Sequence, residues 1–304
     1  MNAFSRIAAA LLAAYVVSGL GCSSQSIKAP KTDLARVEQM RLAMGTVSGS
    51  SDSGGAAAVV PMAEPTGWGT LKGNFKMVGA PPQNPTLNVS GDDISICNPN
   101  GQAIYSNAIE VAGDGGLKNV LLFVTTDLKP EAPWTHPSVV EATSGEVEFD
   151  QKACRFLDHV FAMKAGQPLK VLNSDPTGHN TNLLTKKNLP FNRTVPANGS
   201  VNVALDTPET APFNVKCSIH PWMSAYIMVC PNGYFALTDE QGNFEIPNLP
   251  SGVDLELRVW HEKTNFLNDV EINGQPVKKG KFTVNLQPDQ TNEISVDLPA
   301  AMFN

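Results

Sequence analysis

The clearest chemical signal in the chain is a thiol, an imidazole and a thioether at regular spacing. Cys217, His220 and Met223 follow one another at intervals of three residues, in a turn between two apolar runs. A second imidazole, His179, lies 38 residues before Cys217. Two imidazoles, one thiolate and a weak axial thioether form the donor set of a blue-copper centre, in which the soft sulfur ligands favour copper. These residues therefore predict a copper site suited to electron transfer.

Three other chemistries would use part of the same set. Cys217 and His220 could act as nucleophile and base, although such dyads usually draw their partners from separate segments and no orienting group is evident here. Zinc would require more thiolates, and methionine is a poor zinc ligand. Cys217 could also belong to a disulfide, with the histidines incidental. None of these uses all four residues, so we favour copper and expect no enzymatic activity.

The order and spacing of these residues resemble a cupredoxin, and Cys-x2-His-x2-Met with Pro221 after the histidine resembles the loop of amicyanin. The resemblance covers about residues 151–230. It is carried upstream by Phe156, Val160, Lys164–Gln167, Val171–Asn173 and His179–Asn180, in the cupredoxin order of strand, Gly turn, strand and ligand loop. The resemblance implies that copper is the cofactor and that its ligands are His179, Cys217, His220 and Met223.

The resemblance also implies how a partner would reach the site. Electrons would enter or leave through the solvent-facing edge of His220. Pro221 and Trp222 would form an apolar docking patch beside that edge, where a redox partner protein binds. Asn180 would connect the two ligand loops through Ser218.

One position departs from the amicyanin pattern. Amicyanin has proline two residues after the copper cysteine, and proline has no backbone N–H. This chain has Ile219 there, which keeps one. We therefore expect two hydrogen bonds to the thiolate, from the N–H groups of Asn180 and Ile219, and a raised reduction potential. The alternative is that Ile219 only fills an apolar gap and that its N–H points to solvent or to another acceptor.

The five cysteines divide by context. Cys217 is assigned to copper and Cys22 to a lipid, which leaves Cys97, Cys154 and Cys230. Cys230 ends an apolar run and is expected to be a buried free thiol. Cys97 lies in a polar loop and Cys154 begins the cupredoxin-like segment, so we expect a disulfide between them.

The N-terminus has the pattern of an export signal. Arg6 precedes the apolar run 7–17, and the following small residues end at Cys22. The Gly-Cys ending resembles a bacterial lipoprotein signal and predicts a signal peptide over residues 1–21 and acylation of Cys22; an ordinary signal cut nearby is the alternative. Residues 22–65 are rich in small and polar residues and predict a flexible tether. We expect an exported protein, periplasmic or at the cell surface, anchored to the membrane by lipid.

Composition limits the remaining classes. The 304 residues carry 29 acidic and 22 basic side chains, a net charge of −7, which argues against binding to nucleic acid. No run of 18 apolar residues is present, so we expect no membrane-spanning helix after processing. Glycine and proline number 24 and 23, which suits a turn-rich β protein.

Short alternating runs separated by turns predict an all-β fold, with a cupredoxin-like Greek-key sandwich and a second, smaller sandwich at the C-terminus. Residues 66–150 are β-rich without a recognisable motif, and either extend the cupredoxin sandwich or form a separate one. Residues 151–230 are assigned to the copper domain. Residues 231–304 contain the stretch Thr238–Gly252, which resembles a transthyretin-like, carboxypeptidase-regulatory-like module.

Together these features predict an exported blue-copper protein that carries single electrons by Cu(II)/Cu(I) cycling. The alternative from a different class is a cell-surface binding or scaffold protein whose copper is structural or stored.

Overall fold

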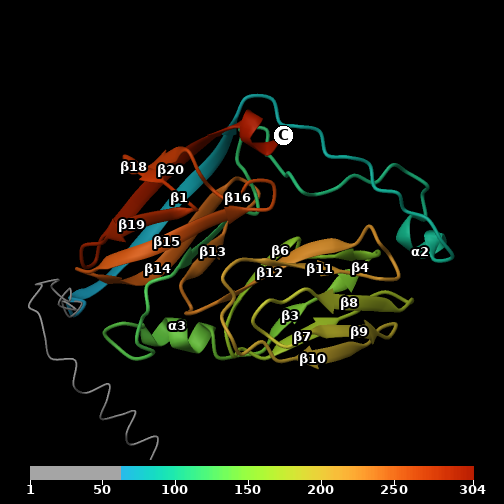
Figure 1. The fold of residues 1–304 in the computed structure, drawn as a ribbon, viewed down its shortest axis with the longest axis horizontal. Helices are drawn as coiled ribbons and strands as arrows, with labels where there is room; N and C mark the ends of the chain where they lie inside the picture. The colour runs from blue at the N-terminus through green and yellow to red at the C-terminus, as the bar shows by residue number, and fades with distance from the viewer. Residues whose placement is uncertain (1–62) are drawn as a thin grey trace, which may run out of the picture. The chain divides into compact units, whose positions relative to one another are not determined.

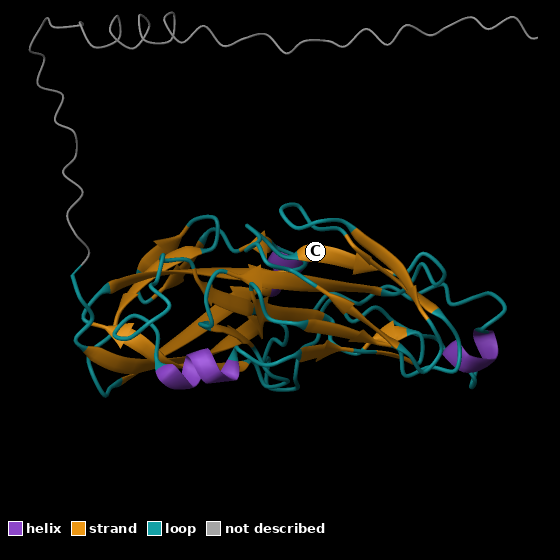
Figure 2. Ribbon diagram, turned by 90° about the horizontal axis from the view of Figure 1, so that it is seen from below, coloured by secondary structure: helices purple, strands orange, loops and turns teal. Residues whose placement is uncertain are grey.

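The structure, a computed structural model, describes residues 63–304. The predicted signal peptide and acylated Cys22 lie outside this range, as does the predicted tether except for residues 63–65. Strands dominate the described part, and its helices are short (Figure 2). They are α2 (Ile94–Cys97), α3 (Pro137–Ala142) and a final 3-10 turn, Ala300–Phe303. The all-β prediction is confirmed, and none of the helices found in residues 63–304 is long and apolar enough to cross a membrane.

The first sandwich contains the predicted ligands and is formed by two sheets. The larger sheet has the strand order β6-β12-β11-β8-β9 and the smaller one β10-β7-β3. Their bounds are β3 (Val147–Phe149), β6 (Val160–Lys164), β7 (Leu169–Leu172), β8 (His179–Leu183), β9 (Phe191–Val195), β10 (Ser200–Val203), β11 (Phe213–Lys216) and β12 (Ser224–Cys230).

Alternation along the strands forms the core of this sandwich. Leu169 and Val171 of β7 are buried, as are Phe213 and Val215 of β11, while their neighbours along each strand are less buried. Successive side chains of a strand point to opposite faces, so the apolar set collects between the two sheets. One apolar cluster joins these residues to Cys217 and Met223, so the ligand loop is packed onto the core. This agrees with the predicted cupredoxin-like sandwich.

The second sandwich is formed by strands from both ends of the described chain (Figure 1). One sheet has the order β14-β1-β20, and the other β13-β2-β15-β16 with β19 also paired to β15. Their bounds are β1 (Gly67–Val78), β2 (Leu121–Val124), β13 (Phe235–Leu237), β14 (Asn243–Ser251), β15 (Asp254–His261), β16 (Asn265–Phe266), β19 (Lys281–Asn285) and β20 (Thr291–Pro299). Two small hairpins complete the list, β4 (Gln151–Lys152) with β5 (Arg155–Phe156) and β17 (Val270–Ile272) with β18 (Gln275–Val277).

Strand pairing runs across the bounds predicted at residues 150 and 230. β1 pairs in parallel with β20 and antiparallel with β14, and β2 lies between β13 and β15. In contrast, β3 pairs in parallel with β7 of the first sandwich. The segment 66–150 is therefore shared: its first two strands complete the second sandwich, and its last strand completes the first sandwich.

The two sandwiches meet along a buried apolar strip. Leu121, Phe123 and Trp260 of the second sandwich pack with Val160 and Met228 of the first. The same interface contains a buried pair between the side chains of His159 and Glu262. This packing joins the sandwiches through side chains and not only through the linking chain.

Between β1 and β2 a long excursion, residues 79–110, leaves the second sandwich and reaches the ligand end of the first; we call it the arm (Figure 1). It contains α2, and its two limbs are joined by a β-bridge between Thr86 and Tyr105. The arm thus brings residues from before the first sandwich to the site described below.

Candidate metal centre

The predicted ligands meet at one end of the five-stranded sheet. β8 and β11 are antiparallel neighbours, with Lys216 opposite Asn182. The start of β8 and the end of β11 consequently lie at the same edge. His179 is the first residue of β8, Cys217 directly follows β11, and the loop from β11 to β12 carries His220 and Met223. The sheet register therefore brings the two sequence segments together.

Two imidazoles and the thiol converge at this edge. His179 Nδ1 lies 2.9 Å from His220 Nδ1, and Cys217 Sγ lies 3.8 Å from His220 Nδ1. The three side chains offer ligand atoms within 4.8 Å of one another. All are buried, with exposures of 0%, 2% and 3% for His179, Cys217 and His220, and Met223 is 1% exposed beside them in the loop. Burial and convergence together are typical of a metal site.

The sulfur of Cys217 is the acceptor for two backbone N–H groups. Asn180 donates from 3.3 Å, as expected, but the second donor is His220, also at 3.3 Å, in place of the expected Ile219. The loop turns so that the N–H of Met223 bonds to the carbonyl of His220, and Ile219 faces outward with 48% exposure. The sequence-based assignment of Ile219 as donor is therefore wrong by one residue. Two N–H donors hold the sulfur in a fixed position at the edge of the sheet.

Asn180 connects the two ligand segments. Its Oδ1 accepts a hydrogen bond of 3.1 Å from the backbone N–H of Ser218, and its Nδ2 donates to Asn192 Oδ1 at 2.7 Å. The first of these is the bridge that the sequence analysis expected. It holds the loop after Cys217 at a fixed distance from the start of β8.

Each imidazole is held by a carboxylate at its other nitrogen. His179 Nε2 lies 2.7 Å from Asp175 Oδ2, and His220 Nε2 lies 3.1 Å from Asp93 Oδ2. An ionised carboxylate only accepts hydrogen bonds, so each Nε2 carries the proton. In neutral rings both Nδ1 atoms then present lone pairs to each other and to sulfur. A cation between them satisfies this arrangement, and carboxylate-held imidazoles are the usual surroundings of a metal. The donor set, two nitrogens with a thiolate and a nearby thioether, fits copper.

Asp175 also organises the chain next to the site. Its carboxylate accepts hydrogen bonds from the N–H groups of Ala153 at 2.7 Å and Cys154 at 2.8 Å. Both residues have a φ of 51°, which is costly for residues other than glycine. Burial alone would raise the pKa of Asp175, but the hydrogen bonds from Cys154, His179 and Ala153 outweigh it and lower that pKa. The pKa of His179 is lowered, first by its own burial.

The arm supplies the second carboxylate and is fastened beside it. Cys97 forms a disulfide with Cys154, the pair that the sequence analysis expected. Asp93 Oδ1 accepts a hydrogen bond of 2.9 Å from the Thr177 hydroxyl. This bond, followed by the one from His220, lowers the pKa of Asp93. Of the two free thiols in residues 63–304, Cys217 is at the site and Cys230 is buried elsewhere in the sheet.

The prediction that one edge of His220 faces solvent is wrong. The residue is 3% exposed, because Asp93 and the disulfide-linked arm lie over its outer nitrogen. Trp222 is half-buried; its ring packs 5.0 Å from that of His220, and its Nε1 donates to the carbonyl of Cys154 at 3.1 Å. Pro221 is exposed. The predicted docking patch therefore consists of one exposed residue and one that helps to hold the arm.

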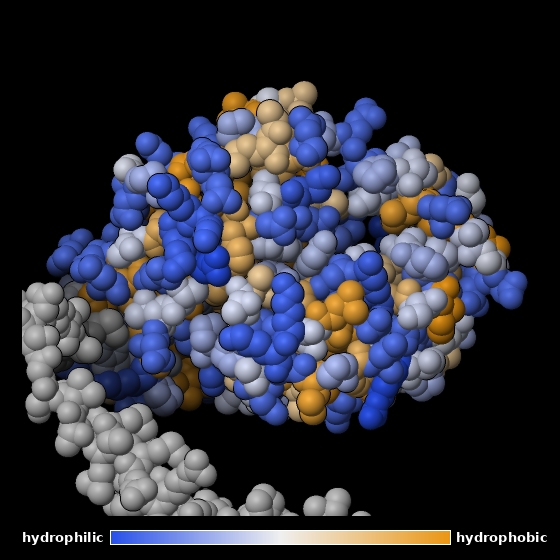
Figure 3. Space-filling view, viewed as in Figure 1, coloured by the Kyte–Doolittle hydropathy of each residue, from blue (hydrophilic) through white to orange (hydrophobic). Residues whose placement is uncertain are grey.

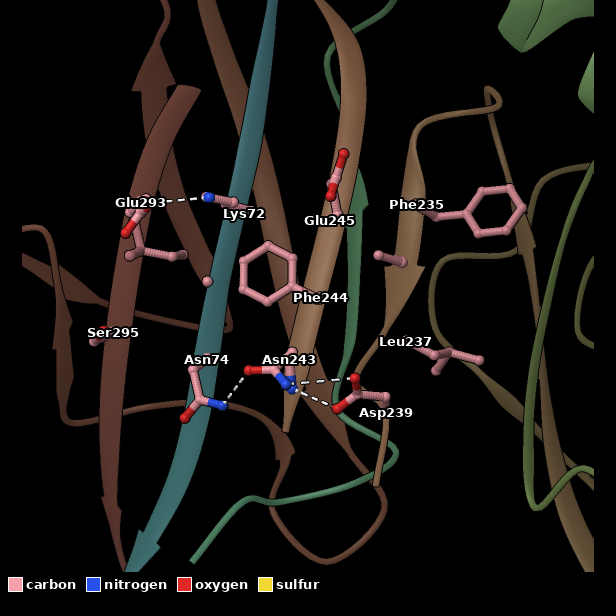
Figure 4. Close-up of a pocket in the computed structure, with 13 residues that line it drawn as sticks. Lys72, Asn74, Phe235, Leu237, Asp239, Asn243, Phe244, Glu245, Glu293 and Ser295 are labelled. Atoms are coloured by element: carbon pink, nitrogen blue, oxygen red, sulfur yellow. Dashed lines mark hydrogen bonds and ion pairs between the residues drawn. The ribbon is translucent and has the colours of Figure 1, made fainter. Parts of the chain in front are cut away.

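One groove in the described surface is separate from this site. It is a groove of about 690 Å³ on the second sandwich, lined by β1, β14, β20 and β13 (Figure 4). Two pairs of its polar side chains bond to each other: Lys72 with Glu293 at 2.9 Å, and Asn74 Nδ2 with Asn243 Oδ1 at 2.8 Å. None of the residues that line it belongs to the ligand cluster. The convergent donors, and not this groove, therefore form the candidate functional site.

No family model and no curated protein matches the chain. Among solved structures, amicyanin from Paracoccus versutus matches with 17% identity over 36% of this chain and 96% of that one, at a TM-score of 0.25. An amicyanin variant in its reduced Cu(I) form matches with 12% identity over 36% of this chain and 97% of that one, at a TM-score of 0.25.

A third solved structure is a copper-containing nitrite reductase from Thermus scotoductus, with 19% identity and a TM-score of 0.26. That match spans 28% of this chain and only 22% of the reductase. Likenesses at this level say nothing of what the present chain binds or does.

Proposed function

We propose that this chain holds one copper ion at His179, Cys217, His220 and Met223 and carries single electrons. The observation that supports this most strongly is the pair of Nδ1 atoms, 2.9 Å apart, whose Nε2 atoms are both occupied by carboxylates. Copper bound there would supply reversible one-electron chemistry. The residues of the chain hold that ion, exclude water and keep the donors fixed.

Rigidity of the donors is what suits such a site to electron transfer. Little has to move between the two oxidation states when the ligands are held by their surroundings. Here Asp175 and Asp93 orient the imidazoles, Asn180 fixes the loop, and Met223 is packed in the core. The low exposure of the donors also leaves a substrate little access, which favours a carrier over an enzyme.

Voltammetry of the copper-loaded protein tests this function. We expect one reversible one-electron couple and fast electron exchange with a small redox protein. The zinc-loaded protein is the matched control, because zinc has no redox chemistry in this range. Copper that is bound tightly but is neither oxidised nor reduced on this timescale would contradict a carrier.

A cell-surface protein with stored or structural copper is the second candidate. The burial of His220 beneath the arm favours it, because a covered ligand slows electron exchange with a partner. Slow exchange together with intact copper binding is the result that this candidate predicts.

We also propose that the protein is exported, is anchored to a membrane by lipid at Cys22, and meets its redox partner at the His220 end of the first sandwich. The support is the N-terminal sequence pattern and the position of the ligands at a sandwich edge. Several acyl chains anchor a protein stably. Recovery in the membrane fraction, released by detergent but not by salt, is expected for the wild type and not for Cys22→Ala.

A further inference from the structure

The outer nitrogen of His220 is bonded to a residue from a distant part of the chain. Asp93 precedes His220 by 127 residues and reaches it because the arm crosses to the ligand end of the first sandwich. The side chain of His220 is 4% exposed and that of Asp93 31% exposed. A carboxylate at the edge of the protein is thus turned inward onto a buried ligand.

Local structure leaves this carboxylate free for that contact. Asp93 is the N-cap of α2, where an aspartate side chain usually accepts a hydrogen bond from the second or third N–H of the helix. Here the side chain makes no such bond. Its two oxygens are directed instead to Thr177 Oγ1 at 2.9 Å and His220 Nε2 at 3.1 Å. The N-terminus of α2 therefore has no side-chain cap, and the carboxylate of Asp93 bonds to His220 instead.

The disulfide fastens the arm four residues further along. Cys97 ends α2 and is bonded to Cys154, whose carbonyl accepts the hydrogen bond from Trp222 Nε1. The sulfurs of Cys97 and Cys154 lie within 4.8 Å of a ring nitrogen of His220. The disulfide therefore lies directly beside the ring of His220. In this position it keeps Asp93 within hydrogen-bonding distance of that ring.

We propose that Asp93 is a positioning residue that holds His220 through its Nε2–H, biases the copper site toward Cu(II), and is kept in place by the Cys97–Cys154 disulfide. This rests on the proposed copper site. A carboxylate that accepts the outer N–H makes an imidazole a stronger donor. Stronger donation stabilises Cu(II) more than Cu(I), so the contact lowers the reduction potential.

Asp93→Asn tests the contact, with Asp92→Asn as the matched control. Asp92 is an exposed neighbour, so its substitution removes the same charge from the arm without touching His220. We expect Asp93→Asn to weaken Cu(II) binding relative to Cu(I) by about tenfold, measured by competition with chelators selective for each state. For one electron, tenfold corresponds to a rise of about 59 mV in potential. A shift in Asp93→Asn no larger than in Asp92→Asn would overturn the proposal.

The double variant Cys97→Ser/Cys154→Ser tests the role of the disulfide. If the disulfide acts by holding Asp93, its loss raises the potential in the same direction, and adding Asp93→Asn then changes little further. Coupled sites give such non-additive effects. Fully additive shifts would show that the disulfide does not act through Asp93.

The metal-free protein provides a readout that does not depend on copper. We expect a slowly exchanging Nε2–H of His220 in the nitrogen-15 NMR spectrum of the wild type and Asp92→Asn, and its loss in Asp93→Ala, which has no acceptor at that position. Rapid exchange in the wild type would contradict the inference even where copper binds. A wild type that binds no copper but shows the protected proton would contradict the proposed function and leave the contact standing.

Discussion

The two carboxylate–imidazole pairs at the candidate site are built in different ways. Asp175 stands four residues before His179 in one loop, and its side chain is 5% exposed. Asp93 comes from the arm and is 31% exposed. Asp175 also holds the turn at Ala153 and Cys154, whereas the other contact of Asp93 is one hydroxyl. One pair therefore belongs to the core of the sandwich, and the other is an addition that can be altered without disturbing it.

The largest expected effect concerns the sulfur that both imidazoles face. Cys217→Ser should abolish the charge-transfer colour of the copper protein and weaken copper binding severely, because the soft donor is lost. The fold should persist, as judged by circular dichroism, since the core does not depend on one loop thiol. Cys230→Ser is the control: it removes the other free thiol of residues 63–304 and should leave the colour unchanged. An unchanged spectrum in Cys217→Ser would mean that the cysteine is not a ligand.

The difference between the two carboxylates is testable as stability of the metal-free protein. Asp175→Ala should lower the free energy of unfolding by about 3 kcal/mol or more, because it leaves a buried imidazole and two N–H groups without an acceptor. Asp93→Ala should cost less, about 1 to 2 kcal/mol, because its own side chain is partly solvated and its loss leaves a single buried N–H, that of His220, without an acceptor. Urea unfolding of both variants gives the comparison. Equal losses would show that the two pairs are not distinguished in this way.

His261 extends the comparison to a buried imidazole that has no carboxylate at its outer nitrogen. Its Nε2 is buried without a hydrogen-bond partner, and burial lowers its pKa from 6.5 to about 4. The unfolded chain then binds the proton first as pH falls. Stability is therefore fully present above pH 6.5 and is lost between pH 6.5 and about 4.

The expected loss follows from the size of the shift. A difference of about 2.5 pKa units at about 1.36 kcal/mol each is about 3 kcal/mol. Urea unfolding between pH 6.5 and about 4 measures how the free energy of unfolding changes with pH. We expect His261→Phe to remove most of that change. A variant that retains the wild-type slope would assign the pH dependence to other groups.

The smallest effect is expected at the thioether. Met223→Leu should keep the colour and shift the potential modestly, because the axial bond is weak. The shift should be seen by voltammetry, with copper affinity nearly retained. Loss of colour in this variant would give Met223 a larger share in the site than the blue-copper assignment allows.

Much of the site could be predicted because its determinants are local in sequence. The spacing of Cys217, His220 and Met223 places them in one loop, and His179–Asn180 identifies the neighbouring strand. Asp175 lies four residues before His179, so its position is also local, but an aspartate in a loop carries no sequence signal that marks it as the partner of an imidazole. Ile219 was misassigned because which N–H faces sulfur depends on the turn of the loop, and residue spacing alone does not determine that turn.

The covering of His220 could not be predicted, because it depends on contacts between distant segments. Asp93 lies in a stretch without a recognisable motif, and only the path of the arm brings it to the ligand. The contribution of residues 66–150 to both sandwiches also depends on contacts between segments that are distant in sequence. The parallel pairing of β1 with β20 joins segments more than 200 residues apart, and both strands show the same alternation as any other strand. The face of the molecule drawn in Figure 3 is mostly hydrophilic, with small apolar patches.

The visible absorption spectrum of the wild-type protein, loaded with one equivalent of Cu(II), tests the central claim most directly. We predict an intense thiolate-to-copper charge-transfer band that gives a blue protein, absent from the zinc-loaded form and bleached by one electron per chain. Weak absorption of the kind given by copper bound only to nitrogen and oxygen would contradict the claim. It would show that Cys217 does not share a copper ion with His179 and His220.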